Sequence, residues 1–276
     1  MLEKLMKQEN RIKDSFVFSG TIIGAISTVS GILGYSLGDA LEKSPVLTRL
    51  IIVIVTTLCL AFMKYAFIGW RFKNSITLTI QNTAVEICCG NIFDIDGLRV
   101  IGCDTHFDTR VDDIVISKSS LHGQLVLNHG KTDEIKAAIE QAAQRLHLLR
   151  QSDGFYHFPL GSIIKYTSSV DGKTYLMLAM TELDENYKAH TNMAKFESML
   201  MQMWAEIDRV YARETVVLPL LGTGISRFDN GKDRANLLRC MLCTMNQSGV
   251  NLNCNVKIVI YGNAQDIPLY EYKNLF

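Results

Sequence analysis

A short apolar segment that ends in two glycines is the part of this sequence best suited to bind a ligand. Residues 215–221 are mostly aliphatic or β-branched, which predicts a buried strand. Gly222 and Gly224 then allow a tight turn and leave no side chain to keep a ligand away from the backbone. Helical periodicity follows in residues 231–245. A strand, a glycine turn and a helix N-terminus together present N–H groups to an anion, usually a phosphate.

The glycine spacing by itself leaves two interpretations open. It lacks the lysine of the P-loop and the third glycine of the dinucleotide fingerprint. A strand that ends in Gly-x-Gly is also compatible with a plain tight turn that binds nothing. The choice between a phosphate site and a plain turn therefore depends on the rest of the sequence.

Length and composition limit what these elements can be. The chain has 276 residues, enough for one medium domain and an appendage, and its formal net charge is zero. Because no excess of positive charge attracts nucleic acid, we expect no nucleic-acid partner. Among seven cysteines, Cys240 and Cys243 lie inside a helix without a second pair at zinc spacing. This pattern predicts buried thiols in a reducing compartment and no metal site.

Two long apolar segments near the N-terminus predict a transmembrane hairpin. Residues 15–38 contain no charged side chain, and residues 50–70 contain only Lys64. As a helix, each is long enough to cross a hydrocarbon core of about 30 Å. A cleaved signal peptide fits less well, because the first segment is too long and a second one follows it. We therefore expect a short N-terminal segment at residues 1–14 and two transmembrane helices within residues 15–71.

Basic residues near these segments predict an orientation. Four lysines and arginines precede the first segment and two follow the second. The connecting loop also has basic residues, but acidic neighbours offset their charge. The positive-inside rule then places both termini of this multi-pass chain in the cytoplasm and the connecting loop outside. Lys64 can either reach the inner headgroups or line a pore, and the sequence does not decide between these roles.

Small residues in the first segment favour self-association. Gly20 and Gly24 lie four positions apart, and so do Gly34 and Gly38. Such pairs let helices approach closely in lipid, where van der Waals contact drives association. Glycine is common in membrane helices for other reasons too, but two pairs in one segment lead us to expect a homo-oligomer.

The rest of the chain alternates strands and helices, which predicts an α/β domain with a mixed sheet between helices over residues 74–276. Asp171 and Gly172 form a hairpin turn signal between two of the strands. The expected strands are residues 75–80, 85–89, 98–103, 162–168, 174–181, 215–221 and 256–261. The expected helices are residues 133–149, 189–212 and 231–245.

Three segments of this domain resemble, in order, the ligand loops of macro domains, which are modules that bind ADP-ribose. Residues 90–93 are similar to the motif that meets the adenine, residues 119–125 stand where the first phosphate loop lies, and residues 218–228 resemble the second phosphate loop. The resemblance implies a macro-domain fold. The implied contacts to an ADP-ribose derivative are Asn91, Ile92, Cys103, Asp104, His106, Ser119, Ser120, Leu121, His122, Gly123, Gly222, Thr223, Gly224, Ile225, Ser226, Arg227 and Phe228.

Two departures from the macro-domain pattern bear on activity. Asn91 stands where the family has an acid, and an amide can still pair with a base edge. Residues 103–108 replace an Asn-Ala-Ala-Asn segment that positions the distal ribose and a water in macro-domain hydrolases. The loss of the Asn-Ala-Ala-Asn segment predicts that no hydrolysis occurs. Asp104, His106 and Asp108 remain open as an acid–base set, as contacts to a group on the distal ribose, or as solvated loop residues.

A two-helix membrane hairpin followed by a divergent macro domain resembles the effectors of type II Thoeris anti-phage defence. In that family a TIR-domain enzyme makes an ADP-ribose derivative, histidine-ADP-ribose, and the effector then oligomerises and disrupts the inner membrane. The resemblance implies the same ligand, a lipid bilayer as partner, abortive infection as the outcome, and neither catalysis nor a cofactor. A membrane-tethered ADP-ribosyl hydrolase and a passive anchored ADP-ribose-binding module stay open as alternatives.

Overall fold

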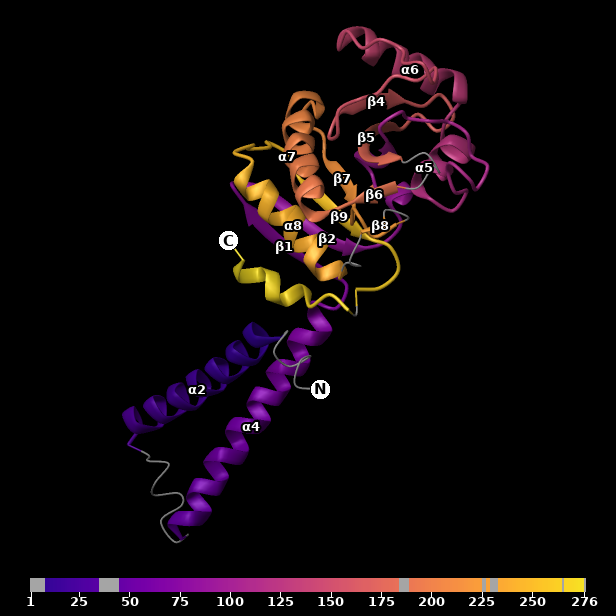
Figure 1. Cartoon of the computed structure of the whole chain (residues 1–276). Helices are drawn as coiled ribbons and strands as arrows, with labels where there is room; N and C mark the ends of the chain where they lie inside the picture. The colour runs from indigo at the N-terminus through magenta and orange to yellow at the C-terminus, as the bar shows by residue number, and fades with distance from the viewer. Residues whose placement is uncertain are drawn as a thin grey trace. The chain divides into compact units, whose positions relative to one another are not determined.

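The structure is a computed structural model that describes residues 8–34, 45–183, 189–224, 227–228, 233–264 and 266–275. Its contacts divide the chain into two compact units. One unit comprises Met1–Ile76 together with Pro268–Leu275, and the other comprises Thr77–Ile267 and Phe276. The first contains two apolar helices and the second contains the sheet (Figure 1).

The apolar helices are α2 (Glu9–Ile32) and α4 (Val46–Arg71). Both are long and apolar enough to cross a membrane. They pack against each other, and the buried positions of the pair include Ser15, Ser19 and Ala61. Small side chains suit close approach of two helices. The hydroxyls of Ser15 and Ser19 donate to carbonyls one turn earlier, at 2.7 and 2.8 Å, so neither is buried without a partner.

The first helix differs from the expected span at both ends. It begins earlier, at Glu9, and it ends at Ile32. Gly34 lies in the turn that follows, with φ +77° and its N–H donating to the carbonyl of Gly31. The Gly34 and Gly38 pair was therefore wrongly placed on a helix, since Gly34 terminates α2 and Gly38 lies outside the described residues.

The C-terminal segment caps α2 within the same unit. It forms a 3₁₀ helix, η3 (Leu269–Asn274), whose Glu271 carboxylate accepts from the N–H groups of Asn10 and Arg11 at 2.9 and 3.1 Å. First-turn N–H groups lack partners inside a helix, and a negative charge there is favoured by the helix dipole. Gln8, the N-cap residue, makes no side-chain cap hydrogen bond. The Glu271 side chain therefore caps the N-terminus of α2, although Glu271 lies near the other end of the sequence.

Arg11 also connects the two apolar helices. Its guanidinium lies 3.6 Å from the ring centroid of Tyr65 and donates two hydrogen bonds to the carbonyl of Tyr65, at 2.9 and 2.7 Å. A Cβ atom at Gly69 would lie 2.0 Å from this guanidinium. Gly69 is thus required for the approach of Arg11 to α4. Lys64, for which two roles were open, lies with its ammonium 4.8 Å from the ring centroid of Phe18 on α2.

The second unit is built on one mixed sheet. Its strands are β1 (Ser75–Ile80), β2 (Thr83–Cys89), β3 (Leu98–Asp104), β4 (Ile163–Thr167), β5 (Thr174–Leu183), β6 (Ala189–Thr191), β7 (Val216–Pro219), β8 (Arg227–Phe228) and β9 (Val256–Ile260). They are ordered β1-β2-β9-β7-β3-β5-β6-β8, and β4 also pairs with β5. β2, β9, β7, β3 and β5 are mutually parallel, whereas β4 and β6 run antiparallel to β5. The expected mixed α/β sheet is confirmed.

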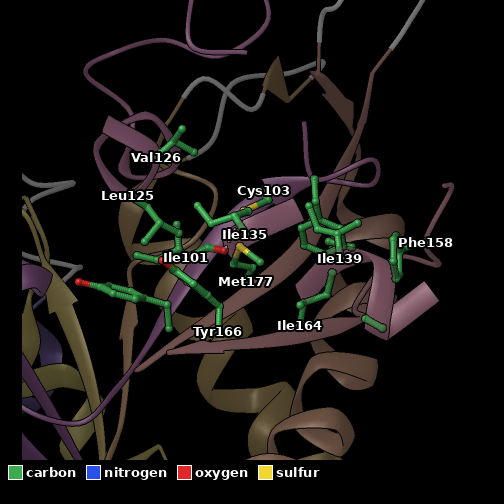
Figure 2. Close-up of a cluster of buried hydrophobic side chains, with 14 of the residues drawn as sticks. Ile101, Cys103, Leu125, Val126, Ile135, Ile139, Phe158, Ile164, Tyr166 and Met177 are labelled. Atoms are coloured by element: carbon green, nitrogen blue, oxygen red, sulfur yellow. Dashed lines mark hydrogen bonds between the residues drawn. The ribbon is translucent and has the colours of Figure 1, made fainter. Parts of the chain in front are cut away.

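Helices cover both faces of this sheet. Ile135 and Ile139 of α6 (Thr132–Arg145) point toward Ile101 and Met177 in the core (Figure 2). Successive side chains of a strand alternate between faces, so the buried Val100 faces the opposite side from Ile101. There α7 (Met193–Val210) and α8 (Arg234–Gln247) lie side by side (Figure 1).

Two helices of the second unit were predicted too long. The helix expected at residues 133–149 ends at Arg145, and the one expected at residues 189–212 begins later than predicted. Residues 189–191 form β6 instead of the start of a helix, because they pair with β5 and β8. The helix α7 begins at Met193, where the Asn192 side chain accepts from the N–H of Lys195 at 2.9 Å. Local sequence favours a helix here, but pairing with two distant strands decides the structure of the first three residues.

Candidate functional site

Parallel pairing brings the candidate ligand segments to one edge of the sheet. The carboxyl ends of β2, β9, β7, β3 and β5 share that edge, where ligands of open α/β sheets bind. Asn91 follows β2, Asp104 ends β3, and Gly222 follows β7. These positions are far apart in the sequence, and the strand order is what aligns them.

The glycine loop after β7 has the predicted tight turn. Gly222 has φ +81°, a left-handed conformation that favours glycine. The N–H of Leu220 continues the ladder to Val259 at 2.9 Å, and the Thr223 hydroxyl donates back to the carbonyl of Leu220 at 2.8 Å. Gly224 is exposed, and no described atom lies within 4 Å of a Cβ built on it. The loop is therefore ordered at its start and open at its tip.

The remaining residues of this loop are described only in part. Ile225 and Ser226, both expected ligand contacts, lie outside the described residues. The backbone of Arg227 and Phe228 forms β8, which pairs with β6 in parallel. The segment after the glycine loop thus returns to the sheet before the next helix begins.

The helix after the loop is already capped at its N-terminus. Asp233, the N-cap residue of α8, accepts from the N–H of Ala235 at 3.3 Å, and its carbonyl accepts from Asn236 and Leu237. This carboxylate occupies the position in which we expected the helix to present free N–H groups to an anion. A phosphate bound at this loop would therefore depend more on the loop backbone than on the start of α8.

The segment 119–123 begins a short helix, as expected. Ser120 caps α5 (Leu121–Gln124), which continues as a π-helical turn, η2 (Leu125–His129). The Ser120 hydroxyl accepts from the N–H of Gly123 at 3.0 Å and donates to the carbonyl of Ser117 at 2.7 Å. A Cβ at Gly123 would lie 2.2 Å from that carbonyl oxygen, so glycine is required there.

The loop after β3 is shaped by two buried acids. Asp104 accepts from the N–H groups of His106 and Asp108, at 2.8 and 3.5 Å. Asp108 in turn accepts from the backbone N–H and the guanidinium of Arg110, at 2.6 to 3.2 Å. Side-chain exposure is 5% for both acids and 19% for His106. Both carboxylates therefore stabilise the loop, and His106 is the more accessible of the three expected residues.

His122 lies close enough to these acids for their charges to act on it. Burial of the ring lowers the pKa of His122, and the charges of Asp104 and Asp108 oppose that shift. The structure thus brings together α5 and the loop after β3, as the resemblance implied. A neutral imidazole beside two carboxylates is the resulting arrangement.

Three expected contact residues have other roles in the structure. The Asn91 side chain accepts from the N–H of Phe93 at 3.2 Å and caps η1 (Ile92–Asp94). Ile92 and Cys103 are both 3% exposed and belong to the hydrophobic core. Cys103 lies within the cluster of Figure 2, and burial raises the pKa of its thiol. The side chains of Ile92 and Cys103 are therefore not available to a ligand.

Sequence reasoning missed two residues next to His106. The imidazole of His157 lies with its ring centroid 4.3 Å from that of His106, and its Nε2 is 2.7 Å from a carboxylate oxygen of Asp153. The only sequence signal is a repeated dipeptide, since His-Phe occurs at 106–107 and again at 157–158. Their proximity depends on tertiary contacts that no local pattern reveals.

Comparison with known proteins places this chain in a family. The model of the family described as "Thoeris protein ThsA, Macro domain" matches residues 85–261. The chain belongs to the ThsA macro-domain family. It is 29% identical over 242 residues to "Thoeris protein ThsA" of Bacillus amyloliquefaciens (strain Y2), which covers 81% of this chain and 78% of that protein. The expected resemblance to Thoeris proteins is confirmed.

Solved structures share the macro-domain fold with this chain. The macrodomain of Oceanobacillus iheyensis with ADP has a TM-score of 0.50 at 16% identity, covering 72% of this chain and 94% of that one. The same macrodomain with MES bound also has a TM-score of 0.50, at 15% identity, covering 73% and 96%. At such low identity the likeness shows the fold, and the predicted macro-domain fold is confirmed.

We predict that His122 makes stability fall in mild acid. The folded pKa is lowered, so below the unfolded value of about 6.5 the unfolded chain binds a proton that the folded chain does not. Stability is present above that pH and is lost below it, by up to about 1.4 kcal/mol per pH unit. Melting temperatures of the full chain in detergent, from pH 7.5 to 5.5, should fall more steeply for wild type than for His122→Gln. His147→Gln, at an exposed histidine, should follow wild type. Equal slopes for wild type and His122→Gln would contradict this.

Proposed function

We propose that this chain is a membrane-anchored effector of anti-phage defence whose macro domain binds an ADP-ribose-derived signal. The main support is the alignment of Asn91, Asp104 and Gly222 at the carboxyl ends of parallel strands. Membership of the ThsA family adds the Thoeris context. The similar macrodomain of Oceanobacillus iheyensis holds ADP, a nucleotide with the same diphosphate.

The diphosphate binds mainly to backbone N–H groups in this proposal. The loop at Gly222–Gly224 brings no bulky side chain near its backbone, and the N-terminus of α5 follows Ser119 and Ser120. Backbone N–H groups in turns and at helix starts bind phosphates without the need for a lysine or arginine. Such a site is consistent with a chain whose net charge is zero.

The distal end of the ligand then lies beside the loop after β3. We propose that the signal is histidine-ADP-ribose, made from NAD by a partner TIR-domain enzyme, and that His106 contacts the distal group. Asp104 and Asp108 already accept hydrogen bonds from the loop backbone and from Arg110. Carboxylates engaged in this way are poor candidates for a general base, so we propose binding without hydrolysis.

The two apolar helices act as anchor and as the assembly surface in this proposal. With α2 and α4 across the inner membrane, both termini lie in the cytoplasm. A face of α2 at Gly20, Gly24 and Gly31 is open, since no described atom lies within 4 Å of a Cβ built on any of them. We propose that ligand-bound copies associate through this face in the bilayer, disrupt it and cause abortive infection. A ligand can favour that state only by binding it more tightly.

We predict that Gly224→Glu abolishes binding of the nucleotide. The position is exposed and accepts a side chain without a clash, so the fold should survive. A carboxylate at this loop would repel the diphosphate and fill its space. Calorimetry of the full chain in detergent with ADP-ribose and histidine-ADP-ribose should show at least a tenfold loss of affinity, about 1.4 kcal/mol or more.

Two controls accompany that titration. Asn253→Glu adds the same charge at an exposed residue in the loop before β9, at the opposite edge of the sheet, and should bind as wild type does. The titrated samples should contain only intact ligand when analysed for products. Unchanged affinity in folded Gly224→Glu would refute the site, whereas ligand breakdown that is lost in His106→Ala would favour the hydrolase.

We predict that Gly24→Leu separates binding from toxicity. A leucine on the open face of α2 prevents close helix approach but meets no atom of the described hairpin. The variant should insert in the membrane and bind the nucleotide normally, yet cells that also express the TIR enzyme should no longer depolarise. Ile26→Leu, at an exposed position on another side of α2, should depolarise cells as wild type does. Depolarisation by Gly24→Leu at the wild-type rate would place the assembly surface elsewhere.

A further inference from the structure

Two His-Phe dipeptides meet at the surface of the macro domain. Phe107 and Phe158 are 1% and 3% exposed and contact each other edge to face, with ring centroids 5.0 Å apart. The N–H of Phe158 donates to the carbonyl of Thr105 at 3.0 Å. These contacts fix the loop after β3 beside the segment that precedes β4. The histidine before each phenylalanine is thereby brought to the same place.

The two imidazoles lie close to each other and to a carboxylate. His106 and His157 have ring centroids 4.3 Å apart, with an angle of 56° between their planes. Nε2 of His157 lies 2.7 Å from Oδ2 of Asp153. One potential ligand atom from each of these three residues lies within 4.8 Å of the other two. Two imidazoles and one carboxylate at this spacing are a common ligand set for transition metals.

The backbone around the three side chains is ordered by hydrogen bonds. Oδ1 of Asp153 accepts from the N–H of Phe155 at 2.9 Å, which leaves Oδ2 for an ion. Gln151 and Phe155 are bonded through their backbones at 2.9 Å, and Asp104 holds the N–H of His106. The three side chains are thus brought together before any ion arrives.

We propose that His106, Asp153 and His157 bind a divalent transition-metal ion such as Zn²⁺. Imidazole nitrogen and carboxylate oxygen are ordinary Zn²⁺ ligands, whereas Mg²⁺ and Ca²⁺ prefer oxygen alone. Nε2 of His157 binds the ion in the tautomer that carries the N–H at Nδ1, because a neutral imidazole offers only one nitrogen lone pair. Two ligand atoms at 2.0–2.1 Å from a tetrahedral ion are roughly 3.3 Å apart, so the pair of His157 and Asp153 opens by about half an ångström. Asp153 and His157 are exposed, so water can complete the coordination.

The metal site shares His106 with the proposed nucleotide site, but a metal titration tests it without the nucleotide. The ion would fasten the loop after β3, at His106, to the segment 153–157 before β4. The sequence predicts no metal site, because it has no second cysteine pair and no histidine pair at zinc spacing. Here the ligands come from two distant segments.

The test is a Zn²⁺ titration of the full chain in detergent after treatment with a chelator. We expect one ion bound in addition to any held by the free cysteines. His157→Gln and Asp153→Asn should each weaken that binding at least tenfold. His147→Gln, at an exposed histidine outside the cluster, should leave it unchanged, and excess Mg²⁺ should not compete.

A second measurement separates metal loss from misfolding. Without metal, both variants should melt as wild type does, and Zn²⁺ should raise the melting temperature of wild type only. The proposal is wrong if wild type binds no Zn²⁺ beyond its cysteines, or if either variant binds it as tightly as wild type.

Discussion

Parallel pairing of β2, β9, β7, β3 and β5 is the constraint on which the candidate site depends. Parallel neighbours need long crossover connections, and here helices supply them and cover the sheet on both faces. Every loop that leaves a carboxyl end then lies on one edge. Asn91 and Gly222 come from distant parts of the sequence, yet the strand order places them on the same side of the molecule. The position of the site thus follows from the topology more than from any single contact.

At that edge, most polar side chains serve the loops themselves. Asp104, Ser120 and Asp233 each accept from a backbone N–H within their own segment. Such local hydrogen bonds satisfy donors that would otherwise be unpaired, and they fix the loop conformations. Many polar side chains at this edge are therefore already engaged, and fewer of them can contact a ligand than the sequence suggests. In the proposed site, recognition of a diphosphate falls to backbone N–H groups. Glycine is needed where the chain turns sharply at Gly222 or packs closely at Gly123.

The features that could be predicted from sequence are those with local causes. Strand and helix periodicity, the glycine turn and the apolar length of the two helices all depend on residues close together in the chain. The features that were missed depend on distant partners. Ala189–Thr191 is a strand because of its neighbours in the sheet, Glu271 caps a helix at the other end of the sequence, and His157 meets His106 through a buried phenylalanine pair. Asn91, which we expect to contact the ligand, also caps its own turn through its side-chain oxygen.

Hydrogen–deuterium exchange of the full chain in detergent, with and without histidine-ADP-ribose, tests the central claim most directly. Bound nucleotide should slow exchange at backbone N–H groups of residues 90–93, 119–123 and 220–224, which lie along the carboxyl edge of the sheet. Exchange in the loop before β9, at the opposite edge, should not change. Protection confined to other segments, or no protection at saturating ligand, would contradict the account.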